Sequence, residues 1–304
     1  MEDKNIKFPK NFPDEKTMLN VLKKTIEKSW KIDMDIEDIN RWLGNFTGKC
    51  YEVSIERRLA LWMLCNFTYY NEEEIKYLCG LLFRKFVHHL MIDNKLTSSD
   101  DAEKCILETG FTSIGRASES GGLILYHFRQ EAKLDLKRFI FPTDMDTTEY
   151  DQIVCVDDVI ISGGTAQRFF HNNIDKIKDK KLYYISLFAS ETAIRKLEEL
   201  GVTVICCLKL DNRNKMFSDE SLAFYKYSDV KQYAYKLAKT YGEIIESKKP
   251  LGHKSGQYYF GMYYNVPNNS LPIFWSNNNW IPIFERKEKY QNEKEAKREY
   301  GYFI

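Results

Sequence analysis

Two adjacent carboxylates and a short glycine-rich segment lie close together in the middle of the chain. Asp157 and Asp158 directly follow an apolar run at residues 153–156, and a Ser-Gly-Gly-Thr segment comes after three further apolar residues. Adjacent carboxylates can accept hydrogen bonds from a vicinal diol, such as the two ring hydroxyls of a ribose, directly or through Mg²⁺. The pair is therefore a candidate ribose and magnesium site.

The Ser-Gly-Gly-Thr segment has the composition of a phosphate-binding loop. Gly163 and Gly164 allow a ligand to come close to the backbone, and Ser162 and Thr165 add hydroxyl donors. A helical pattern follows at once, so the free amides of the helix start would complete an anion site. The alternative is that the acids only end a strand and the glycines form a strand-to-helix turn. The unbroken order of apolar run, acids and loop favours a sugar phosphate site.

This site needs a parallel sheet beneath it, and the surrounding hydrophobic pattern predicts one. Apolar runs at residues 153–156, 182–188 and 202–208 alternate with helical patterns at 167–177 and 191–200. Continuous apolar strands separated by amphipathic helices indicate a parallel sheet covered on both faces. Since open α/β sheets bind ligands at the carboxyl ends of their strands, we expect the two acids at that edge.

Residues 154–165 read Val-Cys-Val-Asp-Asp-Val-Ile-Ile-Ser-Gly-Gly-Thr and resemble the phosphoribosyl diphosphate (PRPP) signature of type I phosphoribosyltransferases. The resemblance implies the α/β fold of that family. It also implies a Mg²⁺-PRPP site, in which Asp157 and Asp158 contact the ribose and the metal. The Ser-Gly-Gly-Thr loop would hold the 5-phosphate.

A second set of segments is similar to phosphoribosyltransferase-like proteins with a C-terminal extension, the PRTase-CE type. The segments are residues 119–122, 126–129, 250–253, 265–269, 271–272, 275, 280 and 282–286. Some such proteins belong to bacterial anti-phage systems, including retrons, so the resemblance implies an effector in a defence system of this kind. We find no nucleobase-binding hood motif, and base specificity is therefore not implied.

Residues 116–122, Arg-Ala-Ser-Glu-Ser-Gly-Gly, are placed where phosphoribosyltransferases bind the diphosphate of PRPP. In that role Arg116 would pair with the diphosphate, and Ser118, Ser120 and the Gly121 amide would donate hydrogen bonds. The alternative is a serine-rich cap at the start of a helix, with Glu119 as a capping residue. Both roles are compatible.

The C-terminal extension is rich in aromatic residues, Asn and Pro. We expect three parts: an N-terminal helical region at 1–100, the α/β domain at 101–249, and the extension at 250–304, packed on the α/β domain. Such packing would close the acceptor side of the pocket. His253 would then be a candidate acid or base and Asn268 a ligand contact, whereas a lone loop histidine is otherwise structural or exposed to solvent.

Composition excludes a global electrostatic attraction to nucleic acid or membrane. The 304 residues carry 45 Lys and Arg against 44 Asp and Glu, a net charge of +1. No run of 18 apolar residues occurs, and seven cysteines without C-x-x-C spacing predict reduced thiols. We therefore expect a cytoplasmic protein without a membrane partner. The N-terminal helical region could dock a protein or nucleoprotein partner.

Two functions follow from these features. The first is an enzyme that binds Mg²⁺-PRPP or a related ribosyl nucleotide and transfers or cleaves at the anomeric carbon. Such a transfer needs positioning and charge stabilisation rather than a strong acid or base. The second is a PRPP- or nucleotide-sensing module that binds its ligand without turnover, because a fold alone does not fix a function.

Overall fold

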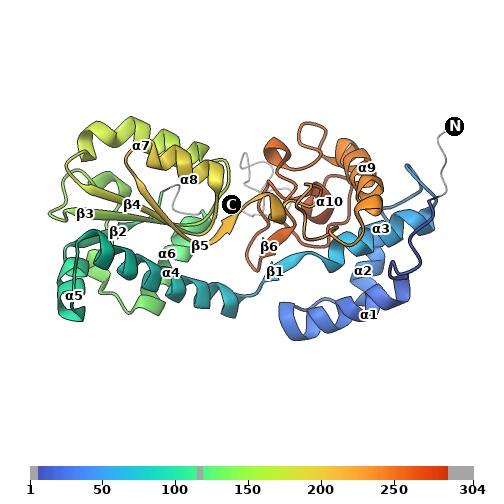
Figure 1. Cartoon of the computed structure of the whole chain (residues 1–304), viewed down its shortest axis with the longest axis horizontal. Helices are drawn as coiled ribbons and strands as arrows, with labels where there is room; N and C mark the ends of the chain where they lie inside the picture. Colours follow the sequence, from blue (N-terminus) through green and yellow to red (C-terminus); the bar gives the residue numbers. More distant parts are fainter. Residues whose placement is uncertain (1–5, 115–118, 287–304) are drawn as a thin grey trace, which may run out of the picture. The chain divides into compact units, whose positions relative to one another are not determined.

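The computed structural model describes residues 6–114 and 119–286, which form two compact units (Figure 1). The α/β unit comprises residues 70–222. The helical unit combines residues up to 69 with those from 223 onward, so it is built from both ends of the chain. These boundaries differ from the predicted ones at residues 100 and 249.

The α/β unit contains the predicted parallel sheet. Its strands run in the order β2 (Thr109–Thr112), β3 (Gln152–Ile160), β4 (Lys181–Ser190) and β5 (Thr203–Leu210), and every neighbouring pair is parallel. Most residues of β3 and β4 are buried. Helices cover both faces of the sheet, which is why these strands read as continuous apolar runs (Figure 1). The predicted fold class is confirmed.

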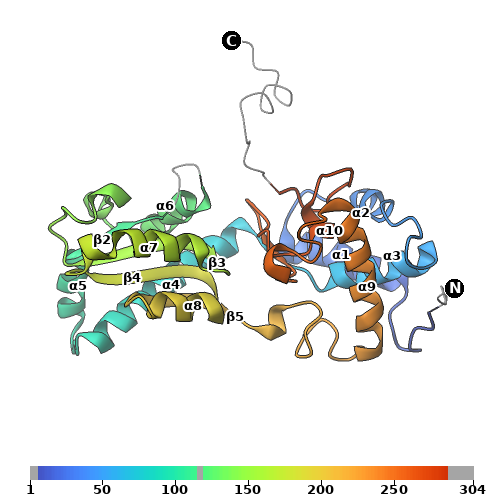
Figure 2. The same ribbon diagram turned by 90° about the horizontal axis from the view of Figure 1, so that it is seen from above.

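One face of the sheet is covered by α7 (Gly164–Ile177) and α8 (Glu191–Glu198), as Figures 1 and 2 show. Phe170 of α7 and Leu197 of α8 are fully buried in a cluster with Tyr184 of the sheet. Burying a large apolar side chain stabilises the fold by roughly 1.5–3 kcal/mol. This face therefore fixes the two helices that flank the candidate site.

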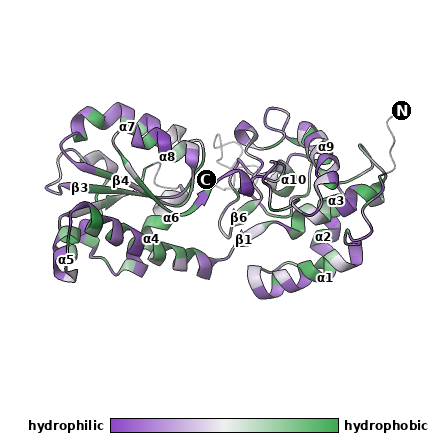
Figure 3. Ribbon diagram, viewed as in Figure 1, coloured by the Kyte–Doolittle hydropathy of each residue, from purple (hydrophilic) through white to green (hydrophobic). Residues whose placement is uncertain are grey.

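The opposite face carries α4 (Glu72–Asp93) and α6 (Ser120–Ala132), with α5 (Ser99–Leu107) at its edge. Aromatic rings make the contact: Phe111 of β2 lies 6.0 Å from Phe86 and 5.6 Å from Phe128, between ring centroids. Figure 3 shows that the helices around the sheet carry both hydrophilic and hydrophobic residues. They are amphipathic, as the periodicity predicts.

The order in which the chain adds strands to the sheet changes direction between β2 and β3. After β2 and α6, Phe139 forms a parallel bridge with Phe111 on the outer side of β2, and the Ile140 amide donates to the Phe111 carbonyl at 2.9 Å. The chain then crosses back to form β3 on the other side of β2. The carboxyl ends of β2 and β3 are thus a topological switch point, where open α/β sheets form their ligand crevice.

The helical unit is formed by helices from both ends of the chain. Its elements are α1 (Glu15–Thr25), a π-helical turn (Ile26–Trp30), α2 (Ile36–Leu43), α3 (Val53–Cys65), α9 (Ser228–Ile245), α10 (Pro272–Trp275) and the strand pair β1 (Thr68–Tyr70) and β6 (Phe260–Met262). α9 packs against α3 and α10 (Figure 2). The two-stranded pairing joins the end of α3 to the extension.

The extension packs with the N-terminal helices. The Trp42 indole donates to the carbonyl of Ile273 at 2.8 Å, and the ring of Phe67 stacks on Phe284 at 4.4 Å. A Cβ at Gly242 of α9 would lie 2.0 Å from the Pro250 carbonyl oxygen, so only glycine allows this approach. These contacts place the extension in the helical unit, whereas its predicted packing on the α/β domain stays a prediction.

A buried carboxylate ties this unit together. Glu56 of α3 is fully buried, and its oxygens accept the amides of Gly48, Cys50 and Tyr51 at 2.6–3.0 Å. The Tyr241 hydroxyl of α9 donates to the same carboxylate at 2.6 Å. All four donors are satisfied by one side chain, which joins α3, the loop before it and α9.

Candidate functional site

Asp157 and Asp158 lie inside β3 rather than after its end. The strand was predicted over 153–156, but its pairing with β4 continues to Ile160 opposite Ala189. β2 ends earlier, at Thr112 opposite Cys155. The two acids therefore lie beyond the end of β2, on the open side of β3 at the switch point.

The carboxyl group of Asp157 is engaged at both oxygens. Oδ2 accepts a hydrogen bond from the Tyr184 hydroxyl of β4, and Oδ1 accepts the Asp158 amide at 2.9 Å. Burial, and then the neighbouring charge of Asp158, raise the pKa of Asp157 well above its usual range. Burial and the nearby Asp157 likewise raise the pKa of Tyr184.

Asp158 is more buried than Asp157, with 5% of its surface exposed. Its Oδ1 accepts the amide of Val159 at 2.7 Å. The carboxyl groups of Asp157 and Asp158 also lie close enough to hydrogen-bond to each other, and this contact adds to the raised pKa of Asp157. Both acids therefore supply carboxyl oxygens beyond the end of β2.

The predicted phosphate loop has the required backbone form. Gly163 has a φ of 68°, in the left-handed region that favours glycine, and α7 begins at the next residue. The Ser162 hydroxyl accepts the amide of Gly164, the first residue of α7, at 3.4 Å, whereas within the described part of the chain the amides of Thr165 and Ala166 have no protein acceptor. These free donors lie at the positive end of a helix and suit a phosphate.

The phosphate loop packs against α8 and is hydrogen-bonded to it. A Cβ at Gly163 would lie 3.3 Å from the Ala193 Cα. The Ser190 hydroxyl donates to the Ile161 carbonyl at 2.5 Å, and the Lys196 ammonium donates to the Ser162 carbonyl at 3.0 Å. Sequence reasoning missed these residues; Ser190 carried one usable signal, its place as a helix cap before the pattern at 191–200.

The start of α6 lies against Asp157. A Cβ at Gly121 would be 3.6 Å from Asp157 Oδ1 and 3.4 Å from the Ser113 Cβ. Ser120 is the first residue of the helix and is partly buried. The structure thus brings the described part of the predicted diphosphate segment to the predicted ribose acids. Arg116 and Ser118 lie outside the described residues, and their roles stay predictions.

The hydroxyl of Thr112 is a further polar group at this edge. The residue is fully buried at the last position of β2, opposite Cys155 in the register. Its Oγ1 has no hydrogen-bond partner among the residues described here. A buried hydroxyl without a partner costs about 1–3 kcal/mol, so this position suits a water molecule or a ligand oxygen.

His253 and Asn268 lie in the helical unit, whereas the acids and the phosphate loop belong to the α/β unit. The His253 amide donates to the Asn268 carbonyl at 2.8 Å, and the Asn269 amide group donates to the His253 carbonyl at 3.0 Å. These backbone contacts give both residues a structural role. Their assignment to the ligand site stays a prediction.

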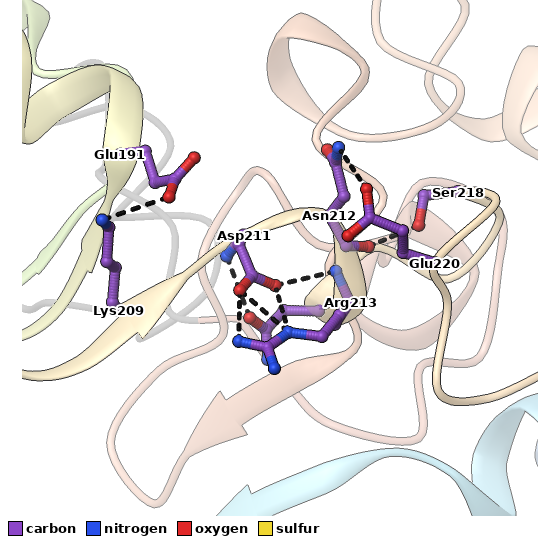
Figure 4. Close-up of polar contacts among 8 residues, drawn as sticks. Glu191, Lys209, Asp211, Asn212, Arg213, Ser218 and Glu220 are labelled. Carbon is purple, nitrogen blue, oxygen red and sulfur yellow. Dashed lines mark hydrogen bonds and ion pairs between the residues drawn. The ribbon is translucent and has the colours of Figure 1, made fainter.

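A polar loop follows β5, and charged side chains within it pair with each other (Figure 4). Arg213 donates to both carboxylate oxygens of Asp211, at 2.6–3.2 Å, and this guanidinium lowers the pKa of Asp211. Beside the loop, Lys209 of β5 pairs with Glu191 of α8 at 3.1 Å. These exposed pairs stabilise the loop and the helix start, and we assign them no chemistry.

The described residues contain neither a cluster of metal-ligating side chains nor a membrane-spanning helix. Within residues 6–114 and 119–286, no group of three or more His, Cys, Asp or Glu side chains forms a metal cluster. Two carboxylates that share a magnesium ion with ligand oxygens remain compatible with the donor set. None of the helices that the structure describes has the length and apolarity to cross a bilayer.

Comparison with known proteins identifies one family. The family model described as PRTase-CE matches residues 39–286 and so runs through both units. No curated protein matches the chain.

Proposed function

Because this chain belongs to the PRTase-CE family, we propose that its α/β unit binds Mg²⁺-PRPP or a related ribosyl phosphate at the carboxyl ends of β2 and β3. The observation that carries the proposal is the approach of Gly121 to Asp157, since a Cβ on that glycine would be 3.6 Å from the carboxylate. A helix start is thereby placed beside the acids, while a second uncapped helix start follows the same strand.

In this proposal each part of the ligand has its own donors. Asp157 and Asp158 accept the ribose hydroxyls, and the Ser-Gly-Gly-Thr loop donates to the 5-phosphate. Ser120 and the Gly121 amide, with Arg116 and Ser118, donate to the diphosphate. The unpartnered Thr112 hydroxyl supports a polar occupant at this edge.

The two carboxylates also fit a magnesium ion. Mg²⁺ is commonly bound by one or two carboxylates together with substrate phosphate oxygens, and Asp157 and Asp158 would supply the protein ligands. When bound, the ion would neutralise charge on the diphosphate leaving group. A bound cation would favour the charged form of Asp157 and so lower the pKa that burial and Asp158 raise in the ligand-free protein.

The chemistry this site would support is rupture of the bond between the anomeric carbon and the diphosphate oxygen. The electron pair leaves with the diphosphate, and an acceptor nucleophile or water forms the new bond to carbon. The protein contributes positioning and preorganised amide donors at the leaving group. No strong acid or base is required for that step.

Calorimetric titration with PRPP, with and without Mg²⁺, tests the binding proposal. We expect binding that depends on Mg²⁺ in the wild-type protein and is lost in the double variant Asp157→Asn/Asp158→Asn. Unchanged affinity in that variant would refute the site. Release of diphosphate from bound PRPP then separates an enzyme from the alternative, a nucleotide-sensing module, which would bind PRPP without releasing diphosphate.

The family resemblance extends the proposal to a biological role. We propose a cytoplasmic effector of a bacterial anti-phage system of the retron kind, with a protein or nucleoprotein partner bound through the N-terminal helical region. Phage plating on cells that carry the gene with its neighbours tests this role. We expect protection with the wild-type chain and none with Asp157→Asn/Asp158→Asn at equal expression.

A further inference from the structure

We propose that α8 sets the peptide orientation of the phosphate loop, with Lys196 and Ser190 as positioning residues for a phosphate monoester. The phosphate loop here means residues 161–165. This inference rests on the proposed function, and it adds residues that neither the sequence motif nor the family match assigns. Neither side chain has to touch the ligand for the role to hold.

Two carbonyls of the loop are turned toward α8. The Ser190 hydroxyl, at the cap of that helix, donates to the Ile161 carbonyl at 2.5 Å. The Lys196 ammonium, one and a half turns into the helix, donates to the Ser162 carbonyl at 3.0 Å. Both donors come from one short helix whose place is fixed by Leu197 in the core.

The orientation of a carbonyl fixes that of the next amide. In a planar trans peptide the C=O of one residue and the N–H of the next point in opposite directions. The amides of Ser162 and Gly163 must therefore point away from α8. Within the described part of the chain neither amide has an acceptor, and both add to the free amides of Thr165 and Ala166.

Four free amides in five successive residues suit a group with several anionic oxygens. A terminal phosphate monoester offers three such oxygens, whereas a neutral sugar hydroxyl offers one acceptor and would leave most of these donors unpaired. The geometry therefore favours a phosphorylated sugar over a free nucleoside. This is the ligand class that the loop selects.

Lys196 is needed because the peptide group between Ser162 and Gly163 could otherwise flip. Glycine populates positive and negative φ about equally, so the peptide between Ser162 and Gly163 can flip at low cost. A flip would aim the Ser162 carbonyl at the phosphate and remove the Gly163 amide. The ammonium opposes it by holding that carbonyl, and the Lys196 stem packs 3.7 Å from the Gly163 Cβ position.

The test compares two anionic ligands in variants of the full chain. Ribose 5-phosphate reports on the phosphate loop, and inorganic diphosphate with Mg²⁺ reports on the start of α6. We expect Lys196→Met to weaken ribose 5-phosphate binding about tenfold or more, as for one lost charge-assisted hydrogen bond. Diphosphate binding should stay within about twofold, and Lys196→Arg should restore much of the loss.

The matched control is Lys209→Met, which removes a lysine that pairs with α8 at Glu191 and does not touch the loop (Figure 4). We expect unchanged binding of both ligands. Ser190→Ala is the second variant, because it removes the other carbonyl contact if Lys196→Met folds poorly. A cooperative thermal unfolding transition like that of the wild type shows that a variant is folded.

Three results in the variants would overturn the inference. They are wild-type affinity of both Lys196→Met and Ser190→Ala for ribose 5-phosphate, an equal loss in the Lys209→Met control, or a loss of both ligands together in folded variants. A wild-type protein that binds neither ligand would overturn the proposed function and this inference with it. Wild-type binding that persists in the variants overturns the inference alone.

Discussion

The carboxyl group of Asp157 shares its two oxygens between the Tyr184 hydroxyl and the Asp158 amide. Burial next to Asp158 makes its charged form costly in the ligand-free fold, so its pKa is raised. A bound cation or diol donor would offset that cost. Asp157 therefore lowers the stability of the free protein, and its proposed role in binding would explain why a residue with this cost is present.

Asp157→Asn should separate these two effects. A raised pKa means that the folded state holds a proton that the unfolded state has lost, so the wild type loses stability as pH rises above about 4. Each unit of raised pKa costs about 1.4 kcal/mol at high pH. Asp157→Asn also replaces one of the two acceptor oxygens with an amide group that donates. We therefore expect the melting temperature of the variant, relative to wild type, to rise as the pH is raised from 4 to 7, and PRPP to bind more weakly. A difference in melting temperature that does not change with pH would contradict the raised pKa.

The two loop glycines should respond differently to substitution. Gly163 has a positive φ and contacts Ala193, whereas a Cβ at Gly164 meets only the Ser162 hydroxyl at 3.7 Å. We expect Gly163→Ala to lower the free energy of unfolding by about 1–3 kcal/mol. Gly164→Val should leave it nearly unchanged and still abolish ribose 5-phosphate binding, because its side chain obstructs the amides. Thermal melts and calorimetry on the pair check both outcomes.

At this scale the sequence indicates as candidates the residues that belong to one continuous motif. Asp157 and the loop glycines are candidates because strand, acids and loop follow one another along the chain, and their ligand roles stay predictions. Tyr184 and Lys196 could not, since their contacts depend on strand register and on the placement of α8. No local spacing encodes either of those.

At the scale of elements, the proposed site depends on two strands of unequal length. β2 stops at Thr112, and β3 continues to Ile160 along β4. The apolar pattern predicted the start of β3 but ended it at Val156, because two carboxylates inside a strand read as a strand end. Pairing with β4 on the other side keeps the backbone extended through the acids.

Within the helical unit, the Glu56 carboxylate joins α3, the loop before it and α9 by hydrogen bonds. Its removal should therefore lower the free energy of unfolding of this unit. Glu56→Gln keeps the size but replaces one acceptor oxygen with donors that face amide N–H groups. We expect a loss of about 2–4 kcal/mol in the free energy of unfolding of this unit. Tyr241→Phe removes one of the four donors to the carboxylate, together with the acceptor of the Thr47 amide at 2.7 Å, and should cost about 1–1.5 kcal/mol. Equal losses in the two variants by chemical denaturation would contradict the central role of the carboxylate.

At the scale of the whole molecule, the family match covers one continuous range, whereas the two compact units do not follow the order of the chain. The match runs continuously over residues 39–286, while the helical unit closes by joining both ends of the chain. The aromatic-rich extension could be predicted to be buried, since so many large apolar side chains are rarely left in water. Its partners could not, because pairing between residues more than 200 positions apart leaves no periodic signal.

This discontinuous unit makes a prediction about truncation at Pro250. A chain of residues 1–249 would lose Ile273, Phe274 and Phe284, and so would uncover the rings of Trp42 and Phe67, which contact them. Each large side chain that is exposed costs roughly 1.5–3 kcal/mol, which summed over this interface exceeds the stability of a small unit. We therefore expect the helical unit of the fragment to lose cooperative unfolding and become protease-sensitive. The α/β unit has its own core and should still protect residues 70–222 and bind ribose 5-phosphate. Limited proteolysis with and without the ligand distinguishes the two units, and a fragment with one wild-type-like cooperative transition would show that the extension is dispensable.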